Sequence, residues 1–244
     1  MVHDRYACPP TVRKFLIFLI SVILIAAMVA GYFLFLSPSR KSLGTAFVIP
    51  WIRNSQAHPD WAVQALTQCD GAPFVLPTNG LIGYLWDDSF KLGHRHQGID
   101  VFAGTAIGIT PVYAVYDGYL TRLPDWKSTL IIRIPSDPLQ PDRQIWTYYT
   151  HMADPQGNPL IAIEYPAGTY EEFVKAGTLL GYQGDFSGDP NNPVGVHLHF
   201  SIVKDDGTGQ FLNELDINNT LDPSPYFGLT LNSNNRPAFP IKCP

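Results

Sequence analysis

Cysteine is scarce in this chain, with three cysteines among 244 residues. A domain of this length buries an ample hydrophobic core without disulfide staples, so their small number is no obstacle to folding. Basic runs, internal repeats and coiled-coil heptads are missing, which leaves no visible repeat-type binding module and no long spacer. The chain also has no His-Glu-x-x-His motif, and this absence excludes the helical metalloproteases that use a glutamate base.

One long stretch without charge is present near the amino terminus. Residues Phe15–Leu36 form an apolar run of about 22 residues, which as a helix rises about 33 Å and matches the hydrocarbon core of a bilayer. A cleaved signal peptide is the alternative, because Arg13 and Lys14 form a basic segment and small residues follow at Ala26, Ala27 and Ala30. The apolar run is too long for an ordinary signal peptide, so we expect an uncleaved membrane anchor.

Charge does not decide the orientation of this anchor. Three basic residues precede the run and three follow it closely: Arg5, Arg13, Lys14, Arg40, Lys41 and Arg53. The positive-inside comparison is therefore nearly balanced. Beyond the anchor, 13 of the 16 basic and 20 of the 21 acidic residues remain, a difference of −7. We therefore expect no nucleic-acid partner and no general attraction to anionic polymers.

The rest of the chain reads as β-rich. One short helix is expected at His58–Thr67, with Pro59 in its first turn. Eight apolar or alternating segments follow, separated by Gly, Pro, Asp and Asn: 74–77, 99–102, 112–123, 129–134, 144–151, 160–163, 178–182 and 196–203. Asp117-Gly118 predicts a hairpin turn inside the third segment. The pattern favours an all-β domain built on an antiparallel sheet, with one transmembrane helix before it.

Two histidine motifs in the β-rich region carry chemistry. His96 and Asp100 lie four residues apart, and His197-Leu198-His199 lies about a hundred residues later. Side chains alternate along a strand, so His197 and His199 share one face and the apolar neighbours take the other. Imidazole and carboxylate suit Zn²⁺, and three protein ligands leave a fourth position open for a catalytic water.

Each motif alone is weak. Most His-x-His pairs on strands are surface or core pairs, and cupin-type barrels with small-molecule chemistry use the same spacing. A third element, Tyr148-Tyr149-Thr150-His151, ends a β-branched and aromatic run in a histidine. On its own, His151 would more often be a strand-end histidine bonded to a backbone carbonyl. The three motifs together are far more specific than any one of them.

The combination resembles the M23 metallopeptidases, also called lysostaphin-type or LytM-type peptidases, which cleave peptide bonds in bacterial peptidoglycan. The resemblance extends over residues 72–228. Further similar segments are Pro77–Gly83 for the opening turn and strand, Thr110–Leu120 for the central hairpin, Gly177–Gly184 for the strand before the last motif and Leu221–Tyr226 for the closing turn. Segments 154–175 and 185–194 depart from the pattern, which puts substrate preference in doubt.

The resemblance implies a fold, a cofactor and a set of roles. His96, Asp100 and His199 would bind Zn²⁺, and His151 and His197 would be unligated catalytic histidines. Zn²⁺ polarises a carbonyl and lowers the pKa of a bound water toward about 7. Histidine, which titrates near neutral pH, can then replace a glutamate as general acid or base. We expect His197 to accept the proton from the attacking water, although the sequence leaves open which histidine does so.

The expected function is a zinc metalloendopeptidase acting on stem or cross-bridge peptides of peptidoglycan. The alternative is a catalytically inactive relative that binds peptidoglycan or activates another hydrolase. Such relatives typically lack a ligand or a catalytic histidine, and all five positions are intact here. The sequence specifies neither the bond that is cleaved, nor the physiological role, nor the oligomeric state.

The expected organisation is a cytoplasmic tail (1–14), a transmembrane helix (15–36), a tether with a short helix (37–71), the metallopeptidase-like domain (72–228) and a C-terminal tail (229–244). A peptidoglycan hydrolase must face outward, so we expect a single-pass membrane protein with its catalytic domain outside the cytoplasm. Cys8 would then lie inside, and Cys69 and Cys243 outside. The two outer cysteines can form a disulfide or stay unpaired.

Overall fold

The computed structural model describes residues 10–31, 44–88 and 94–243. It consists of two units, residues 1–40 and 41–244. The first unit contains helix α1 (Pro10–Gly31), whose segment Lys14–Gly31 has a mean hydropathy of 2.5 and contains no buried residue. Its length and composition are sufficient to cross a membrane, and a signal sequence would have the same properties. The last part of the expected anchor, residues 32–36, lies outside the described residues.

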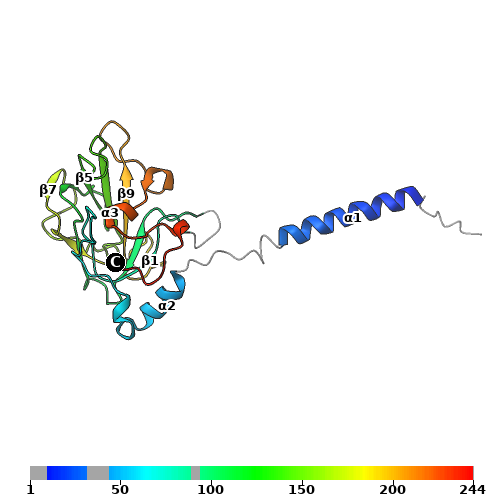
Figure 1. The fold of residues 1–244 in the computed structure, drawn as a ribbon, viewed down its shortest axis with the longest axis horizontal. Coiled ribbons are helices and arrows are strands. Elements are labelled where there is room, and N and C mark those ends of the chain that lie inside the picture. Colours follow the sequence, from blue (N-terminus) through cyan, green and yellow to red (C-terminus); the bar gives the residue numbers. More distant parts are fainter. Residues whose placement is uncertain (1–9, 32–43, 89–93, 244) are drawn as a thin grey trace, which may run out of the picture. The chain divides into compact units, whose positions relative to one another are not determined.

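The second unit is built on antiparallel β-sheet, which confirms the fold class expected from the sequence (Figure 1). In the main sheet the strands follow the order β1 (Leu81–Tyr84), β2 (Ile99–Phe102), β9 (His197–Lys204), β6 (Ile145–Thr150), β5 (Leu130–Ile134), β4 (Gly118–Thr121) and β7 (Glu172–Val174). The short strand β10 (Thr220–Leu221) continues the β2 side of β9. A separate pair consists of β3 (Pro111–Tyr113) and β8 (Leu179–Tyr182).

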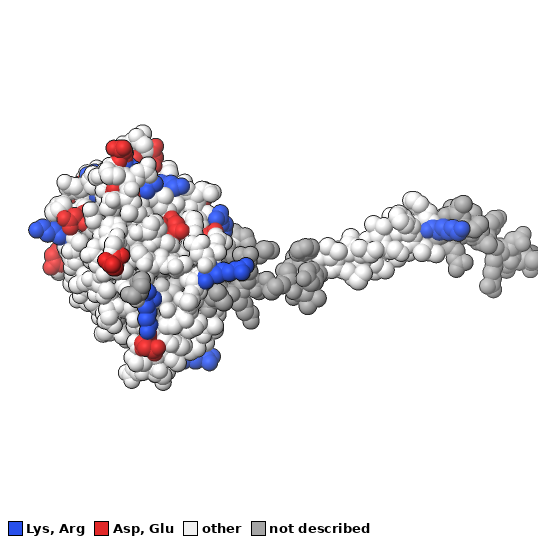
Figure 2. Space-filling model, in the orientation of Figure 1, with Lys and Arg blue, Asp and Glu red and all other residues white. Residues whose placement is uncertain are grey.

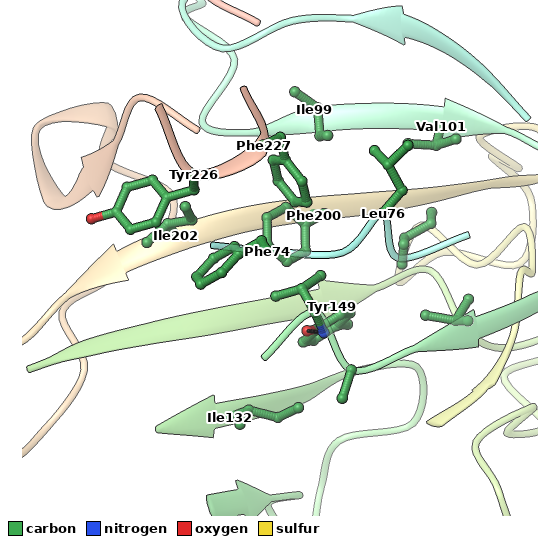
Figure 3. Packing of buried hydrophobic residues seen from close by; sticks show 14 of the residues in the cluster. Phe74, Leu76, Ile99, Val101, Ile132, Tyr149, Phe200, Ile202, Tyr226 and Phe227 are labelled. Atoms are coloured by element: carbon green, nitrogen blue, oxygen red, sulfur yellow. Dashed lines mark hydrogen bonds between the residues drawn. The ribbon is translucent and has the colours of Figure 1, made fainter. Parts of the chain in front are cut away.

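Strand β9 lies at the centre of the sheet and is buried on both faces. Leu198, Phe200 and Ile202 point into the main hydrophobic core, while the histidines occupy the alternate positions. Figure 3 shows Phe200 and Tyr149 packed near Phe74, Tyr226 and Phe227, and further core members from β2 and β5. The alternation read from the sequence therefore holds, and the core fixes which way the histidine face points.

Helix α2 (Thr45–Arg53) covers the β1 end of the sheet through a smaller cluster of side chains. Val48 and Trp51 pack with Leu81 and Phe102, and the Trp51 indole donates a hydrogen bond to the Phe102 carbonyl at 2.8 Å. The tether expected over this region thus includes a docked helix. Its apolar face explains the docking, since Val48 and Trp51 lie three residues apart on one side of the helix.

No α-helix spans His58–Thr67, so the helix expected over the whole segment was wrong. The segment contains one 3₁₀ turn, Pro59–Trp61, and a preceding turn covers Ser55–Ala57. Val63 donates its backbone N–H to Gly80 at 2.8 Å, and Leu66 donates to Leu76 at 2.9 Å. These long-range hydrogen bonds use the backbone groups that a helix would need, and the segment instead lines the sheet edge.

The prediction of a hairpin at Asp117-Gly118 is also wrong. Strand β3 pairs with β8, and β4 pairs with β5 and β7. Gly118 does not have the positive φ of a tight hairpin turn; it lies so close to strand β5 that a Cβ atom would meet the Arg133 carbonyl at 2.5 Å. The Asp117 carboxylate accepts a hydrogen bond from the Ala176 N–H at 2.8 Å, which ties this turn to the segment after β7.

The carboxy-terminal segment packs against the domain. Helix α3 (Ser224–Phe227) buries its two aromatic residues, and Leu229, Leu231 and Ile241 belong to the main core. Cys243 is joined to Cys69 by a disulfide, with the Cα atoms 5.3 Å apart. The sequence left open whether these two cysteines pair, and the structure joins them. The bridge closes a sequence separation of 174 residues.

Candidate metal centre

Three adjacent strands bring the candidate site residues together. Asp100 on β2 and Thr150 on β6 are both cross-strand partners of His199 on β9. His151 follows Thr150 directly at the end of β6, and His96 precedes β2. Because paired strands place opposite residues side by side, residues distant in the sequence meet at one point of the sheet.

The candidate ligand atoms of His96, Asp100 and His199 converge at this point. His96 Nε2 lies 3.0 Å from His199 Nδ1 and 3.1 Å from Asp100 Oδ1, and His199 Nδ1 lies 2.8 Å from the same oxygen. Nitrogen and oxygen ligands lie about 2.0–2.2 Å from Zn²⁺, so atoms about 3 Å apart can share one ion. All three residues are buried. The donor set and its spacing fit a single zinc ion.

Hydrogen bonds orient both ligand histidines. The carbonyl of Leu85 can only accept, so at 2.9 Å it fixes the proton of His96 on Nδ1 and leaves the Nε2 lone pair facing the site. In His199 the arrangement is reversed: Nε2 lies 2.9 Å from Glu214 Oε1, and Nδ1 faces the site. In its neutral form each ring would therefore present an unprotonated nitrogen to a metal ion.

The two remaining histidines lie beside this triad. His197 donates from Nδ1 to the Gly195 carbonyl at 2.8 Å, and His151 donates from Nδ1 to Phe186 at 2.7 Å. Their ring centroids are 4.6 Å apart. Both rings thus direct Nε2 toward the site, in the same manner as His96. His151 has a φ of +70°, a left-handed conformation that is uncommon for histidine and that recurs at functional sites.

The surroundings set the charge of each group. Burial lowers the pKa of His151 to about 3, with further lowering from His197 and His199, and burial also lowers the pKa of His197. Both rings are therefore neutral at neutral pH and can accept a proton. Burial opposes charge on His199 too, but Glu214 and Asp100 outweigh it and raise its pKa to about 10. Asp100 keeps a pKa well below its usual value despite burial, because His96, His197 and His199 surround it.

The site opens into a cavity of about 610 Å³. Besides the five candidate residues, the described residues that line it are Tyr84, His94, Gln97, Phe102, Ser128, Thr129, Tyr148, Thr150, Phe186, Ser187, Gly188, Val194, Glu214 and Leu215. Of the two segments that depart from the family pattern, 185–194 contributes directly to the cavity wall, whereas none of 154–175 lines it. Gly157 in the latter segment instead lies behind Phe186.

Sequence reasoning singled out the five residues that the structure brings together, and it did not single out Glu214. Tyr148, which the sequence shows in the strand that ends at His151, lines the cavity, because its position two residues before Thr150 places it on the His199 side of the sheet. Glu214 lies in the loop between β9 and β10, with no ligand or catalytic motif around it. Only the three-dimensional path of this loop brings it to His199, so no spacing in the sequence could have shown it.

No family model matches the chain, and no curated protein matches it. Among solved structures, it is similar to a protein of Ruminococcus gnavus ATCC 29149 with the provisional name glycyl-glycine endopeptidase lytM, at 26% identity and a TM-score of 0.34 over 56% of this chain. The chain spans 46% of that protein. It is also similar to a variant catalytic domain of the prophage-encoded M23 protein EnpA from Enterococcus faecalis, at 21% identity and a TM-score of 0.36, over 61% of this chain and 95% of that one.

Proposed function

We propose that the chain is a zinc-dependent endopeptidase that hydrolyses peptide bonds of bacterial peptidoglycan. One observation carries the proposal: the ligand atoms of His96, Asp100 and His199 converge within hydrogen-bonding distance of one another, beside two neutral histidines that are not part of the triad. The sequence resemblance supports the reaction and the substrate class.

The three converging residues would hold the zinc ion, and the remaining residues would handle the substrate and the protons. When bound, Zn²⁺ supplies Lewis acidity that polarises a carbonyl and acidifies a water molecule. His197 offers an unprotonated Nε2 in a buried, hydrogen-bonded ring, and we assign to it the acceptance of the proton from the attacking water. The same ring can return this proton to the leaving amine.

His151 lines the same cavity beside His197. Its Nδ1–H is held by the Phe186 carbonyl, so Nε2 is available to accept a hydrogen bond from the attacking water and to orient it. The ring is neutral over the ordinary pH range, so its Nε2 can accept a hydrogen bond and the ring adds no positive charge beside the proposed metal site. The strained backbone at this residue suits a role that requires one fixed ring position.

The apolar helix supports a proposal about the place of action, and the orientation rests on the substrate, because peptidoglycan lies outside the cytoplasm. We propose that α1 and the residues after it anchor the protein as a single-pass membrane protein, with residues 41–244 outside the cytoplasm. On the face shown in Figure 2, acidic and basic side chains of the unit 41–244 are interspersed. Helix α1 carries charge only toward its amino-terminal end. A mixed surface supports recognition of the substrate within the cavity instead of a broad electrostatic attraction.

Digestion of purified peptidoglycan tests the proposal. The full-length protein, purified in detergent, is loaded with zinc and incubated with peptidoglycan and with defined cross-bridge peptides, including a Gly-Gly peptide suggested by the name of the Ruminococcus gnavus protein. We expect new amino termini that disappear with a chelator and return with added zinc. Binding to peptidoglycan without any cleavage over a broad panel would instead support the inactive binding or activating module.

A further inference from the structure

The four site histidines are held by different kinds of acceptor. In His96, His151 and His197 the nitrogen that points away from the site donates to a main-chain carbonyl. In His199 the corresponding nitrogen, Nε2, meets the carboxylate of Glu214 at 2.9 Å. His199 is therefore the one ring of the four with a negatively charged partner behind it.

Hydrogen bonds hold the loop that carries Glu214. Leu215, the next residue, donates its N–H to Asn213 Oδ1 at 3.1 Å and accepts a hydrogen bond from Gln97 Nε2 at 2.9 Å. The Asn213 carbonyl in turn accepts from Asn219 Nδ2 at 2.9 Å. Gln97 directly follows His96 in the chain. The loop that carries Glu214 is thus fastened to the segment that carries another candidate metal ligand.

The location of Glu214 suits it to act on the ring of His199. Its carboxylate lies near the interior of the cavity, with side-chain exposure of 11%. Asp100 faces the opposite nitrogen of the same ring at 2.8 Å. A carboxylate behind a metal-binding imidazole fixes the proton on the outer nitrogen, fixes the ring plane and makes the inner nitrogen a stronger donor. Together Asp100 and Glu214 also supply two negative charges, which match a divalent ion bound by otherwise neutral imidazoles.

We infer that Glu214 is a positioning residue for the metal centre: it holds His199 with Nδ1 directed at the ion and strengthens that nitrogen as a ligand. The inference rests on the proposed zinc site. Glu214 does not itself bind the ion in this arrangement, because the Nε2 atom that it contacts lies on the far side of the ring from Nδ1. Removing the carboxylate should weaken metal binding while leaving the three ligands present.

Zinc affinity of full-length variants tests this role. The parent, Glu214→Ala, Glu214→Gln and a control Glu172→Gln on the exposed edge strand β7 are purified in detergent, stripped of metal and titrated with zinc against a chromophoric chelator. We expect Glu214→Ala to bind zinc about 10–100-fold more weakly than the parent, the usual effect of losing such a partner. Glu214→Gln, which keeps an acceptor and loses the charge, should recover part of this loss, and the control should match the parent.

The outcomes separate this role from others. Parent affinity in both Glu214 variants would overturn the inference while the zinc site stands. Equal losses in Glu214→Ala and Glu214→Gln, with the thermal unfolding midpoint of both metal-free variants lowered, would show a merely structural role and also overturn it. If the parent itself binds no zinc, the proposed function fails first and the inference fails with it.

Discussion

His197 Nε2 lies 3.7 Å from Asp100 Oδ1, the same carboxylate oxygen that lies within about 3 Å of both histidines of the candidate triad. The imidazole of His197 therefore lies beside the candidate triad, whose converging ligand atoms come from His96, Asp100 and His199. His197 and His199 share one face of β9, so a step of two residues along one strand separates the proposed proton acceptor from the proposed metal ligand.

The difference between these two histidines predicts different metal contents in the two alanine variants. His199→Ala removes a ligand atom, so zinc content after reconstitution and desalting should fall well below one equivalent. His197→Ala should retain about one equivalent, as in the parent, because three ligands remain. Metal analysis of the two purified variants at equal protein concentration makes the comparison. Zinc content at the parent's level in His199→Ala would remove His199 from the triad.

The neutral state of His151 can be measured directly. Burial, together with His197 and His199, lowers the pKa of this ring to about 3, whereas a histidine in the unfolded chain titrates near 6.5. We expect its ring resonances in the metal-free protein to show no titration between pH 7 and pH 5, in contrast to an exposed histidine. Assignment of the resonances through a His151→Gln variant identifies the ring. A midpoint near 6.5 would contradict the described environment.

The same pKa difference predicts a pH dependence of stability. On acidification the unfolded state takes up the His151 proton first, so this residue lowers the stability of the metal-free protein progressively as the pH falls from about 6.5 toward about 3. The His151→Gln variant has no such group and should lose stability less steeply over this range. Denaturant unfolding of both proteins at several pH values makes the comparison, and parallel curves would show that His151 contributes nothing to it.

The disulfide between Cys69 and Cys243 should contribute substantially to the stability of the β domain. It closes a long loop and ties the carboxy-terminal segment to the core near Phe227 and Leu229. We expect the paired Cys69→Ala and Cys243→Ala changes to lower the free energy of unfolding by roughly 2–5 kcal/mol. Denaturant unfolding of this variant is compared with a Cys8→Ser control that retains the bridge. An unchanged midpoint in the double variant would show that the bridge does not stabilise the fold.

The apolar helix gives a prediction about the mature protein. An uncleaved anchor requires that residues 15–36 remain attached, and the described part of this segment is long and apolar enough to span a bilayer. Mass spectrometry of protein isolated from membranes should therefore find the amino terminus before Phe15. A mature terminus between Ala26 and Ser39 would show a cleaved signal peptide. Protection of the β domain from external protease in intact spheroplasts would overturn the proposed orientation.

Local alternation was enough to predict the parts of the fold on which the site is built. Ile99–Phe102 is β2 as expected, and the segments around His151 and His197 form β6 and β9 with boundaries shifted by one residue. The apolar residues that alternate with the histidines determined their shared face, since Leu198 and Phe200 had to be buried. The resemblance then indicated that the three motifs belong together, and the structure brings all five residues to one point.

Long-range pairing could not be read from the same sequence. Asp117-Gly118 has the composition of a hairpin turn, but the strands on either side of it pair with other strands. The backbone N–H groups of Val63 and Leu66 donate to Gly80 and Leu76 at the sheet edge and do not form helical hydrogen bonds. Glu214 is the clearest case at the site. Its position depends on the path of the β9–β10 loop and on the hydrogen bond from Gln97 to Leu215, and neither leaves a local pattern.

The rate of cleavage of a defined cross-bridge peptide by the parent and by His197→Ala, measured at equal zinc occupancy, tests the central claim most directly. General acid–base groups contribute about 10²–10⁴-fold, which corresponds to roughly 3–5.5 kcal/mol of barrier. We expect zinc-dependent cleavage by the parent and a loss of this size in His197→Ala, with folding and zinc content retained. Cleavage by His197→Ala at the parent's rate would contradict the assigned role of His197, and a zinc-loaded parent that cleaves no peptidoglycan peptide would contradict the proposed function.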